Sequence, residues 1–298
     1  MPDRHELASR VDPDRHVLIA GPTASGKSGL ALALARSQGG IVVNADALQV
    51  WSCWRVLTAR PSSVDEAAAA HALYGHVHPD QSYSVGDWLT EIGTLLKTGQ
   101  RLIIVGGTGL YHTALTRGLA VIPPVPPGVR AQGDTWLADG GLEEMIAALD
   151  PRTRARLDLR NPARVQRAWE VLTATGRGLA DWQADTPPPL IGPEDATRLV
   201  LHVDRDRLAR RIAQRFDLMV QQGALDEVAA MLPHWDPRAQ WARAIGAAEL
   251  AGYLQGRRSL EDAREQSVVA TRQYAKSQRI WFRNRMRDWT RIEAPYDG

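Results

Sequence analysis

The sequence has a single cysteine, no long apolar run and almost no net charge. Cys53 alone among 298 residues excludes an internal disulfide framework and a zinc site built from a cysteine cluster. It also suits a reducing compartment. No stretch approaches the roughly 20 apolar residues of a membrane-spanning helix, and residues 1–16 lack the apolar centre of a signal peptide. We therefore expect a cytoplasmic protein without a membrane partner.

The overall composition bounds the fold without identifying a partner. A formal net charge of +2 gives the whole chain no general attraction to polyanions. A hydrophobic fraction of 44% supports a sizeable core and excludes global disorder. The length suits one large domain, or a core that carries an inserted subdomain.

The most informative stretch is residues 21–28, which have the spacing Gly-x4-Gly-Lys-Ser. An apolar run over 17–20 predicts a strand before it, and residues 29–35 predict a helix after it. This context is typical of a P-loop, whose backbone N–H groups surround phosphates at a helix N-terminus. Lys27 would reach the outer phosphates and Ser28 would offer its hydroxyl to Mg²⁺. We expect a di- or triphosphate to be bound by Gly21, Pro22, Thr23, Ala24, Ser25, Gly26, Lys27 and Ser28.

Two further predicted strands end in residues suited to a site. Residues 41–44 lead to Asp46, and residues 102–105 lead to Gly-Gly-Thr at 106–108. The carboxyl ends of parallel strands face the ligand crevice, so Asp46 should lie near the P-loop. On position alone Asp46 fits a cap, an indirect Mg²⁺ contact or catalysis equally well. The glycines would let a ligand approach the backbone closely, and the missing acid after the second strand disfavours an ordinary ATPase or GTPase.

The predicted fold is α/β: a P-loop-containing parallel sheet core flanked by helices, with an all-helical insertion domain. Proline blocks at 122–127 and 186–189 predict stiff hinges. We therefore divide the chain into a first core part over 1–121, an insertion over 122–190 and a returning core over 191–298. Ser84 is expected to cap a helix, and residues 197–203 are expected to form a strand. Other helices are predicted over 63–73, 129–137, 142–149, 163–173, 207–222, 224–232 and 260–286.

Arginine is concentrated in two segments of this nearly neutral chain. Residues 152–167 hold six Arg and one acidic residue, and residues 271–291 hold several Arg and Lys with interleaved aromatic residues. Basic clusters with aromatic residues are typical of contact with RNA, whose unpaired bases stack on rings. The alternative is a pair of solvated helix faces with aromatic residues in the core.

Together these segments resemble the tRNA dimethylallyltransferases (tRNA isopentenyltransferases). The P-loop alone is shared with many kinases, whereas Thr-Arg-Gln-x-Ala-Lys at 271–276, combined with the segment around Asp46, is specific. The resemblance covers most of the chain. It is carried by residues 21–28, 44–51, 58–61, 71–85, 106–111, 161–171, 244–246 and 271–283.

The resemblance implies transfer of a dimethylallyl group from dimethylallyl diphosphate to the N6 amine of adenosine at tRNA position 37. Asp46 would then be the base, with Thr108, Lys27 and Arg243 stabilising the leaving oxygens and Ser28 holding Mg²⁺. The target base would leave the anticodon stack. We expect a monomer whose contacts with the anticodon stem-loop are made by Asp46, Ala47, Leu48, Gln49, Thr108, Arg130, Arg164, Arg167, Arg272, Lys276, Arg279 and Arg283.

The chain departs from the family pattern near Asp46, which puts the shape of the base pocket in question more than the reaction. The departures are Ala47 for Ser, Trp51 for Tyr, Leu57 for Gly, Arg60 for Lys and Ala72 for His.

Two other functions remain open. An adenylate isopentenyltransferase, acting on free AMP or ATP, would share the core chemistry but need no grip on tRNA. A small-molecule kinase would use the P-loop for ATP, and the Gly-Gly-Thr strand end disfavours it. A pure RNA-binding module would have no use for a P-loop.

Overall fold

The computed structural model describes residues 11–294 and divides them into two compact units. One unit comprises the chain up to Thr116 together with the chain from Ile191, and the other is Arg117–Leu190. The first unit contains two buried clusters of apolar side chains, and the second unit contains one. No helix within 11–294 is both long and apolar enough to cross a bilayer.

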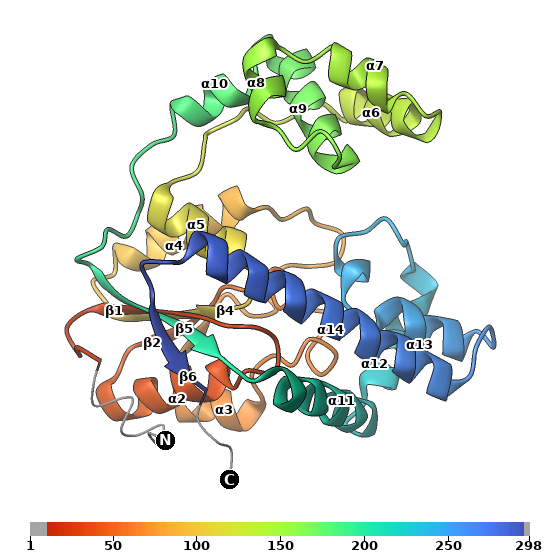
Figure 1. Cartoon of the computed structure of the whole chain (residues 1–298). Coiled ribbons are helices and arrows are strands. Elements are labelled where there is room, and N and C mark those ends of the chain that lie inside the picture. The colour runs from red at the N-terminus through yellow and green to blue at the C-terminus, as the bar shows by residue number, and fades with distance from the viewer. Residues whose placement is uncertain (1–10, 295–298) are drawn as a thin grey trace. The chain divides into compact units, whose positions relative to one another are not determined.

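The first unit is built on one six-stranded sheet in the order β3-β2-β4-β1-β5-β6, and every neighbouring pair is parallel (Figure 1). This confirms the predicted α/β class. The expected returning strand, β5, lies directly beside β1. The strands are β1 (His16–Ala20), β2 (Ile41–Asn44), β3 (His71–Ala72), β4 (Leu102–Gly106), β5 (Ala196–His202) and β6 (Thr290–Glu293).

Helices cover both faces of the sheet, because its central strands are apolar on both sides. In β1, Val17 and Ile19 belong to one buried cluster while Leu18 and Ala20 belong to another, as the two-residue period of a strand requires. α14 (Leu260–Arg285) contributes to both clusters, through Ala275 to the first and Phe282 to the second. The remaining helices of this unit are α2 (Lys27–Gln38), α3 (Ser63–Ala68), α4 (Val85–Leu96), α5 (Gly109–Arg117), α11 (Arg205–Gln221), α12 (Ala224–Met231) and α13 (Ala247–Leu254).

Several predicted helix boundaries are confirmed by their caps. Ser84 accepts the N–H of Asp87 and forms a capping box at the start of α4. Asp204 caps α11, which begins at Arg205, two residues earlier than expected. α14 begins after Ser259, whose hydroxyl accepts the N–H of Asp262.

The helix predicted over 63–73 is wrong in its second half. α3 ends at Ala68, Ala69 is extended, and His71–Ala72 forms strand β3. The N–H of Val42 donates to the Ala70 carbonyl at 2.9 Å, so this segment satisfies backbone groups along the edge of β2. Pairing with the sheet outweighs the helix propensity of the alanines, because propensity is a weak local preference.

The second unit contains only helices over 117–190, all of which the structure describes. The three predicted helices lie at α6 (Pro127–Ala138), α7 (Leu142–Ala147) and α9 (Pro162–Thr175). Their core is formed by Met145, Val165 and Trp169, among others. Two six-residue helices were not predicted, because the arginine-rich and short segments that form them show no apolar period: α8 (Pro151–Arg156) and α10 (Leu179–Ala184).

Candidate active site

The P-loop between β1 and α2 has the backbone of an anion-binding loop. Gly26 caps α2 with φ of 85°, a conformation that favours glycine. The N–H of Ser25 donates to the Pro22 carbonyl at 3.2 Å and closes the loop. No side chain caps the first turn of α2. Its N–H groups, at the positive end of the helix dipole, therefore remain available to phosphate oxygens.

Lys27 makes no ion pair with a carboxylate within residues 11–294. Its Nζ donates to the Pro22 carbonyl at 3.3 Å. Burial lowers the pKa of Lys27 to about 8, an effect that the charge of Asp46 opposes and that of Arg215 increases. A bound phosphate would replace lost solvation with charge attraction and raise that pKa.

An open cavity of about 340 Å³ lies against the loop. It is bounded on one side by the P-loop and on the other by α11. The guanidinium of Arg211 lies against Gly26, since a Cβ there would come within 3.3 Å of its Nη2. The lining residues are Ala24, Ser25, Gly26, Lys27, Ser28, Ala59, Arg211, Gln214, Arg215 and Leu218.

Arg215 is a site residue that the sequence analysis missed. Its Nη1 donates to Thr23 Oγ1 at 3.4 Å, and it lines both cavities described here. Burial lowers the pKa of Arg215, and the charge of Asp46 opposes that shift. The spacing of residues in α11 could have indicated Arg215. Arg211 and Arg215 are four residues apart on an amphipathic helix whose Ile212 and Phe216 are buried, so the two arginines lie on one face.

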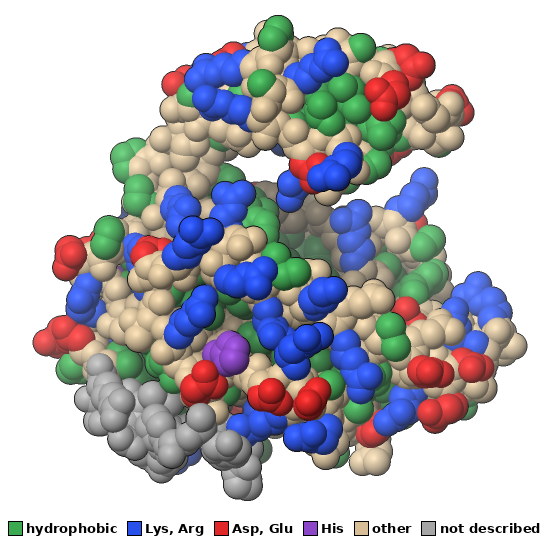
Figure 2. Space-filling view, viewed as in Figure 1, with side chains coloured by type: hydrophobic (Ala, Val, Ile, Leu, Met, Phe, Trp, Pro, Cys, Tyr) green, Lys and Arg blue, Asp and Glu red, His purple; other side chains and the backbone are tan. Residues whose placement is uncertain are grey.

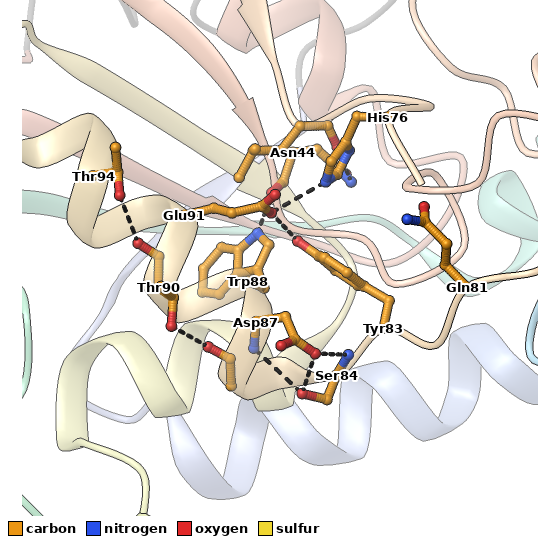
Figure 3. A network of polar contacts seen from close by, with 12 residues as sticks. Asn44, His76, Gln81, Tyr83, Ser84, Asp87, Trp88, Thr90, Glu91 and Thr94 are labelled. Carbon is orange, nitrogen blue, oxygen red and sulfur yellow. Dashed lines mark hydrogen bonds and ion pairs between the residues drawn. The ribbon is translucent and has the colours of Figure 1, made fainter. Parts of the chain in front are cut away.

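Asp46 is held in place by a fully buried asparagine. The N–H of Asp46 donates to Asn44 Oδ1 at 2.8 Å, and Asn44 Nδ2 donates to the carbonyls of Asp46 and Leu73, each at 3.0 Å. Trp88 Nε1 donates to the Asn44 carbonyl at 2.7 Å, which fixes the strand end against α4 (Figure 3). Asp46 Oδ1 accepts the N–H of Leu48 at 3.0 Å.

Thr108 lies beside Asp46, as predicted from the two strand ends. Its Oγ1 accepts the N–H of Ala47 at 3.0 Å, and its own N–H donates to the Ala45 carbonyl at 3.2 Å. Tyr274 on α14 lies close to Thr108 and Gln278, and burial raises the pKa of that tyrosine. Asp46, Thr108 and Tyr274 therefore form one polar group at the edge of the sheet.

Gln278 on α14 joins the P-loop to the Gly-Gly-Thr segment. Its Oε1 accepts the N–H of Thr23 at 2.9 Å and its Nε2 donates to the Gly107 carbonyl at 2.9 Å. The residue is 5% exposed. Gln278 falls within the family-like segment 271–283 but was not predicted as a site residue. Its partners Thr23 and Gly107 lie far away in the chain, and only the fold brings them to it.

The glycines at 106, 107 and 109 each lie against another part of the chain. A Cβ on Gly106 would lie 2.0 Å from the Ala45 carbonyl oxygen, and one on Gly107 would lie 2.3 Å from Gln278 Nε2. A Cβ on Gly109 would lie 2.2 Å from Trp281. These glycines allow close packing of the chain's own segments, which places Thr108 beside Asp46.

A second cavity, of about 80 Å³, opens next to Asp46 and is largely apolar. Thr23, Asp46 and Arg215 form its polar side. The rest of its wall comes from the loop after β2 and from α11, α14 and the loop before α13. These lining residues are Ala24, Leu48, Leu57, Thr58, Ile212, Phe216, Met219, Ile245, Thr271 and Tyr274.

The other residues predicted around the base differ in their placement. Leu48 lines the apolar cavity. Gln49 Nε2 donates to the carbonyls of Thr58 and Ala59 at 2.8 and 3.1 Å, so its amide N–H groups hold a loop. Arg243 ends a 3-10 turn, Trp241–Arg243, with an exposed side chain, and it lines neither cavity. Its catalytic role stays a prediction.

Glu91 anchors the segment before α4. It accepts a 3.1 Å hydrogen bond from His76 Nε2 and a short one from the Tyr83 hydroxyl (Figure 3). His78 pairs with Asp80 on the surface. His78 and Tyr83, which belong to the family-like segment 71–85, therefore both make hydrogen bonds to nearby carboxylates.

The predicted basic residues of α14 share one helix face. Arg272, Lys276, Arg279 and Arg283 are spaced by four, three and four residues, while Ala275, Gln278 and Phe282 are buried on a neighbouring face of the helix. None of the four makes an ion pair within residues 11–294. Lys and Arg side chains gather over α14 in Figure 2. We call these four residues the basic row.

In the helical unit, a buried carboxylate organises two predicted arginines. Glu170 is fully buried; Arg130 Nε lies 3.5 Å from its Oε1 and Arg167 Nη1 lies 3.7 Å from its Oε2. Arg164 lies 3.9 Å from Asp158. Both guanidinium groups on Glu170 are about half exposed, which leaves part of each available to a phosphate.

A parallel sheet with a P-loop after its central strand defines an α/β protein of the P-loop class. The model of the family described as IPP transferase matches residues 49–285. The chain is 66% identical to the tRNA dimethylallyltransferase of Paracoccus denitrificans over 292 residues, covering 96% of this chain and 97% of that protein. It is 61% identical to that of Cereibacter sphaeroides over 285 residues, covering 96% and 91%. The chain belongs to the IPP transferase family.

Solved structures agree with this assignment. A tRNA isopentenylpyrophosphate transferase from Bacillus halodurans has 29% identity and a TM-score of 0.67, with 94% of this chain and 90% of that chain covered. A eukaryotic dimethylallyltransferase acting on tRNA shares the fold at 24% identity, with a TM-score of 0.78 and coverage of 94% and 73%.

Proposed function

We propose that this chain is a tRNA dimethylallyltransferase. It transfers the dimethylallyl group of dimethylallyl diphosphate to the N6 amine of adenosine at tRNA position 37, giving N6-isopentenyladenosine and diphosphate. The observation that carries the proposal is the position of Asp46 and Arg215 on the wall of an apolar cavity that adjoins the P-loop. A charged head and a short apolar tail fit such a pair of cavities, with a carboxylate beside the junction.

The residues divide the reaction between them. The P-loop, Lys27 and Arg215 bind the diphosphate, and the apolar cavity takes the five-carbon chain. As the amine nitrogen bonds to the first carbon, the bond from that carbon to the diphosphate oxygen breaks. Asp46 accepts the amine proton. Thr108, Lys27 and Arg243 are the proposed stabilisers of the charge that develops on the leaving oxygens.

Mg²⁺ is proposed to act with the diphosphate at Ser28. The Ser28 side chain is exposed and lines the larger cavity beside Lys27. Residues 11–294 contain no group of three His, Cys, Asp or Glu side chains suited to a metal. Ser28 as a single protein ligand fits an ion that is bound mainly by phosphate oxygens and water, the usual state of Mg²⁺ at nucleotide sites. The ion would neutralise charge on the leaving diphosphate.

The basic row and the arginines around Glu170 are the proposed contacts with the anticodon stem-loop. An adenylate isopentenyltransferase is the second candidate function, since its substrate would use the same core. The unpaired charges of the basic row favour the tRNA enzyme, because four cations on one helix face suit a polyanion better than a mononucleotide.

The deciding experiment offers labelled dimethylallyl diphosphate with either bulk tRNA or AMP. We expect label in tRNA and little in AMP, with adenosine as the modified nucleoside after digestion. Transfer to AMP alone would establish the second function, and transfer to neither acceptor would contradict both. Lys27→Ala is the control, since it should abolish transfer to either acceptor.

A further inference from the structure

The cavity beside Asp46 has both polar and apolar lining. Thr23, Asp46 and Arg215 are among its polar lining residues. Leu57 and Phe216 belong to its apolar lining, and they are only 4% and 5% exposed.

Leu57 and Phe216 meet next to the backbone of Gly246. A Cβ at Gly246 would lie 3.2 Å from Leu57 Cδ1 and 3.1 Å from Phe216 Cε2. Gly246 has φ of 95°, so a side chain there is disfavoured by the backbone as well. Leu57 and Phe216 therefore pack together against this glycine, and both line the cavity.

The backbone of Leu57 is fixed by a carboxylate from α12. Glu227 Oε1 accepts the N–H groups of Arg55 and Val56 at 2.8 and 2.7 Å, and Oε2 accepts that of Leu57 at 3.0 Å. Three hydrogen bonds to a charged acceptor hold the loop strongly. The backbone of Leu57 therefore cannot shift away from the cavity without losing these bonds.

The volume of the cavity limits what it holds. It holds about 80 Å³, less than the ~150 Å³ of an apolar cavity known to accept benzene, so its wall must give way even for a five-carbon chain. Met219, on the same wall, is flexible and half-buried and would yield to a ligand, whereas Leu57 is branched, buried and held by its backbone.

We propose that Leu57 sets the length of the transferred chain, and that it restricts the enzyme to five-carbon allylic diphosphates. The inference rests on the proposed function and adds its chain-length selectivity. A ten-carbon chain with the same diphosphate head must overlap Leu57 or Phe216, while a five-carbon chain ends before them.

The test compares dimethylallyl and geranyl diphosphate as donors to bulk tRNA. Wild type should transfer the ten-carbon chain poorly. Leu57→Ala should raise the ratio of kcat/KM for the ten-carbon over the five-carbon donor by on the order of 10- to 100-fold, the usual effect of steric change in an apolar pocket. Leu57→Met, which keeps the volume, and the distant Leu254→Ala should leave the ratio near that of wild type.

A second variant and a binding measurement keep the outcome decisive. If Leu57→Ala does not fold, Phe216→Leu, which enlarges the same cavity, should raise the ratio in the same direction, and geranyl diphosphate should inhibit it more strongly than wild type. Equal transfer of both donors by wild type, or an unchanged ratio in folded Leu57→Ala and Phe216→Leu, would overturn the inference while leaving the proposed function intact. Absence of dimethylallyl transfer in wild type would overturn both.

Discussion

Asn44 holds Asp46 by two hydrogen bonds: it accepts the Asp46 N–H at 2.8 Å and donates to the Asp46 carbonyl at 3.0 Å. The asparagine is fully buried, and its own carbonyl accepts from Trp88. The position of the proposed base is therefore set by a residue that has no contact with the cavity. A side chain that positions a catalytic base is as necessary to the geometry of the reaction as the catalytic base itself.

Asn44→Ala should displace Asp46 and slow the reaction. We expect kcat to fall about 100-fold, the effect of a misplacement near 1 Å, with little change in KM for dimethylallyl diphosphate. Buried groups left without partners should also destabilise the fold by about 1–3 kcal/mol. Steady-state kinetics and thermal unfolding measure the two effects, and Thr94→Ala, an exposed change on α4, is the control. Wild-type kcat in the folded variant would show that Asn44 does not position the base.

Asp46→Asn should remove the base and leave the shape of the site unchanged. We expect kcat to fall by about 10²- to 10⁴-fold. Donor binding at pH 7 should change little, because loss of the carboxylate removes repulsion toward the diphosphate while also lowering the pKa of Lys27. Single-turnover transfer and donor binding separate the two effects. A turnover within a few-fold of wild type would mean that another group takes the proton.

From the pKa of Lys27 we predict how the affinity for dimethylallyl diphosphate depends on pH. The pKa of Lys27 is about 8 in the free protein, and a bound diphosphate raises it. Below pH 8 the lysine is charged in both states, so affinity should be constant. Above pH 8 binding must take up a proton, and KM for the donor should rise about tenfold per pH unit. A flat profile from pH 7 to 9.5 would contradict the assignment of Lys27 to the diphosphate.

Arg215→Gln should weaken donor binding specifically. Loss of one charge-assisted contact predicts an increase in KM for dimethylallyl diphosphate of about 10- to 100-fold, with KM for tRNA unchanged. Arg210→Gln, an exposed change on the same helix, is the matched control. If both variants behave alike, the position of Arg215 at the cavity has no functional consequence.

The basic row predicts the salt dependence of tRNA binding. Replacement of Arg279 and Arg283 by Gln should weaken binding and reduce the slope of log K against log salt by about 1.4–1.8, the value for two lost phosphate contacts. A control pair, Arg36→Gln with Lys97→Gln, removes the same charge from the ends of α2 and α4. Equal slopes in both double variants would exclude a specific contact by the basic row.

Local patterns were sufficient for much of the site. The P-loop, the cap at Ser84 and the strands ending before Asp46 and Thr108 depend on neighbouring residues, so periodicity and spacing predicted them. The helix expected over 63–73 failed because its second half is needed by the edge of β2. Arg215 and Gln278 were missed because their partners lie far away in the chain, Thr23 for both and Gly107 for the second.

The sequence alone determined the class of fold, the phosphate-binding loop, the helical insertion and the family, because each depends on short-range order and motif spacing. Only the tertiary structure decided which residues share the site. Parallel pairing of β2 and β4 brings Asp46 to Thr108, and packing of α11 and α14 adds Arg215, Tyr274 and Gln278. The apolar cavity lined by Leu57 is likewise formed by long-range packing, which no local pattern encodes.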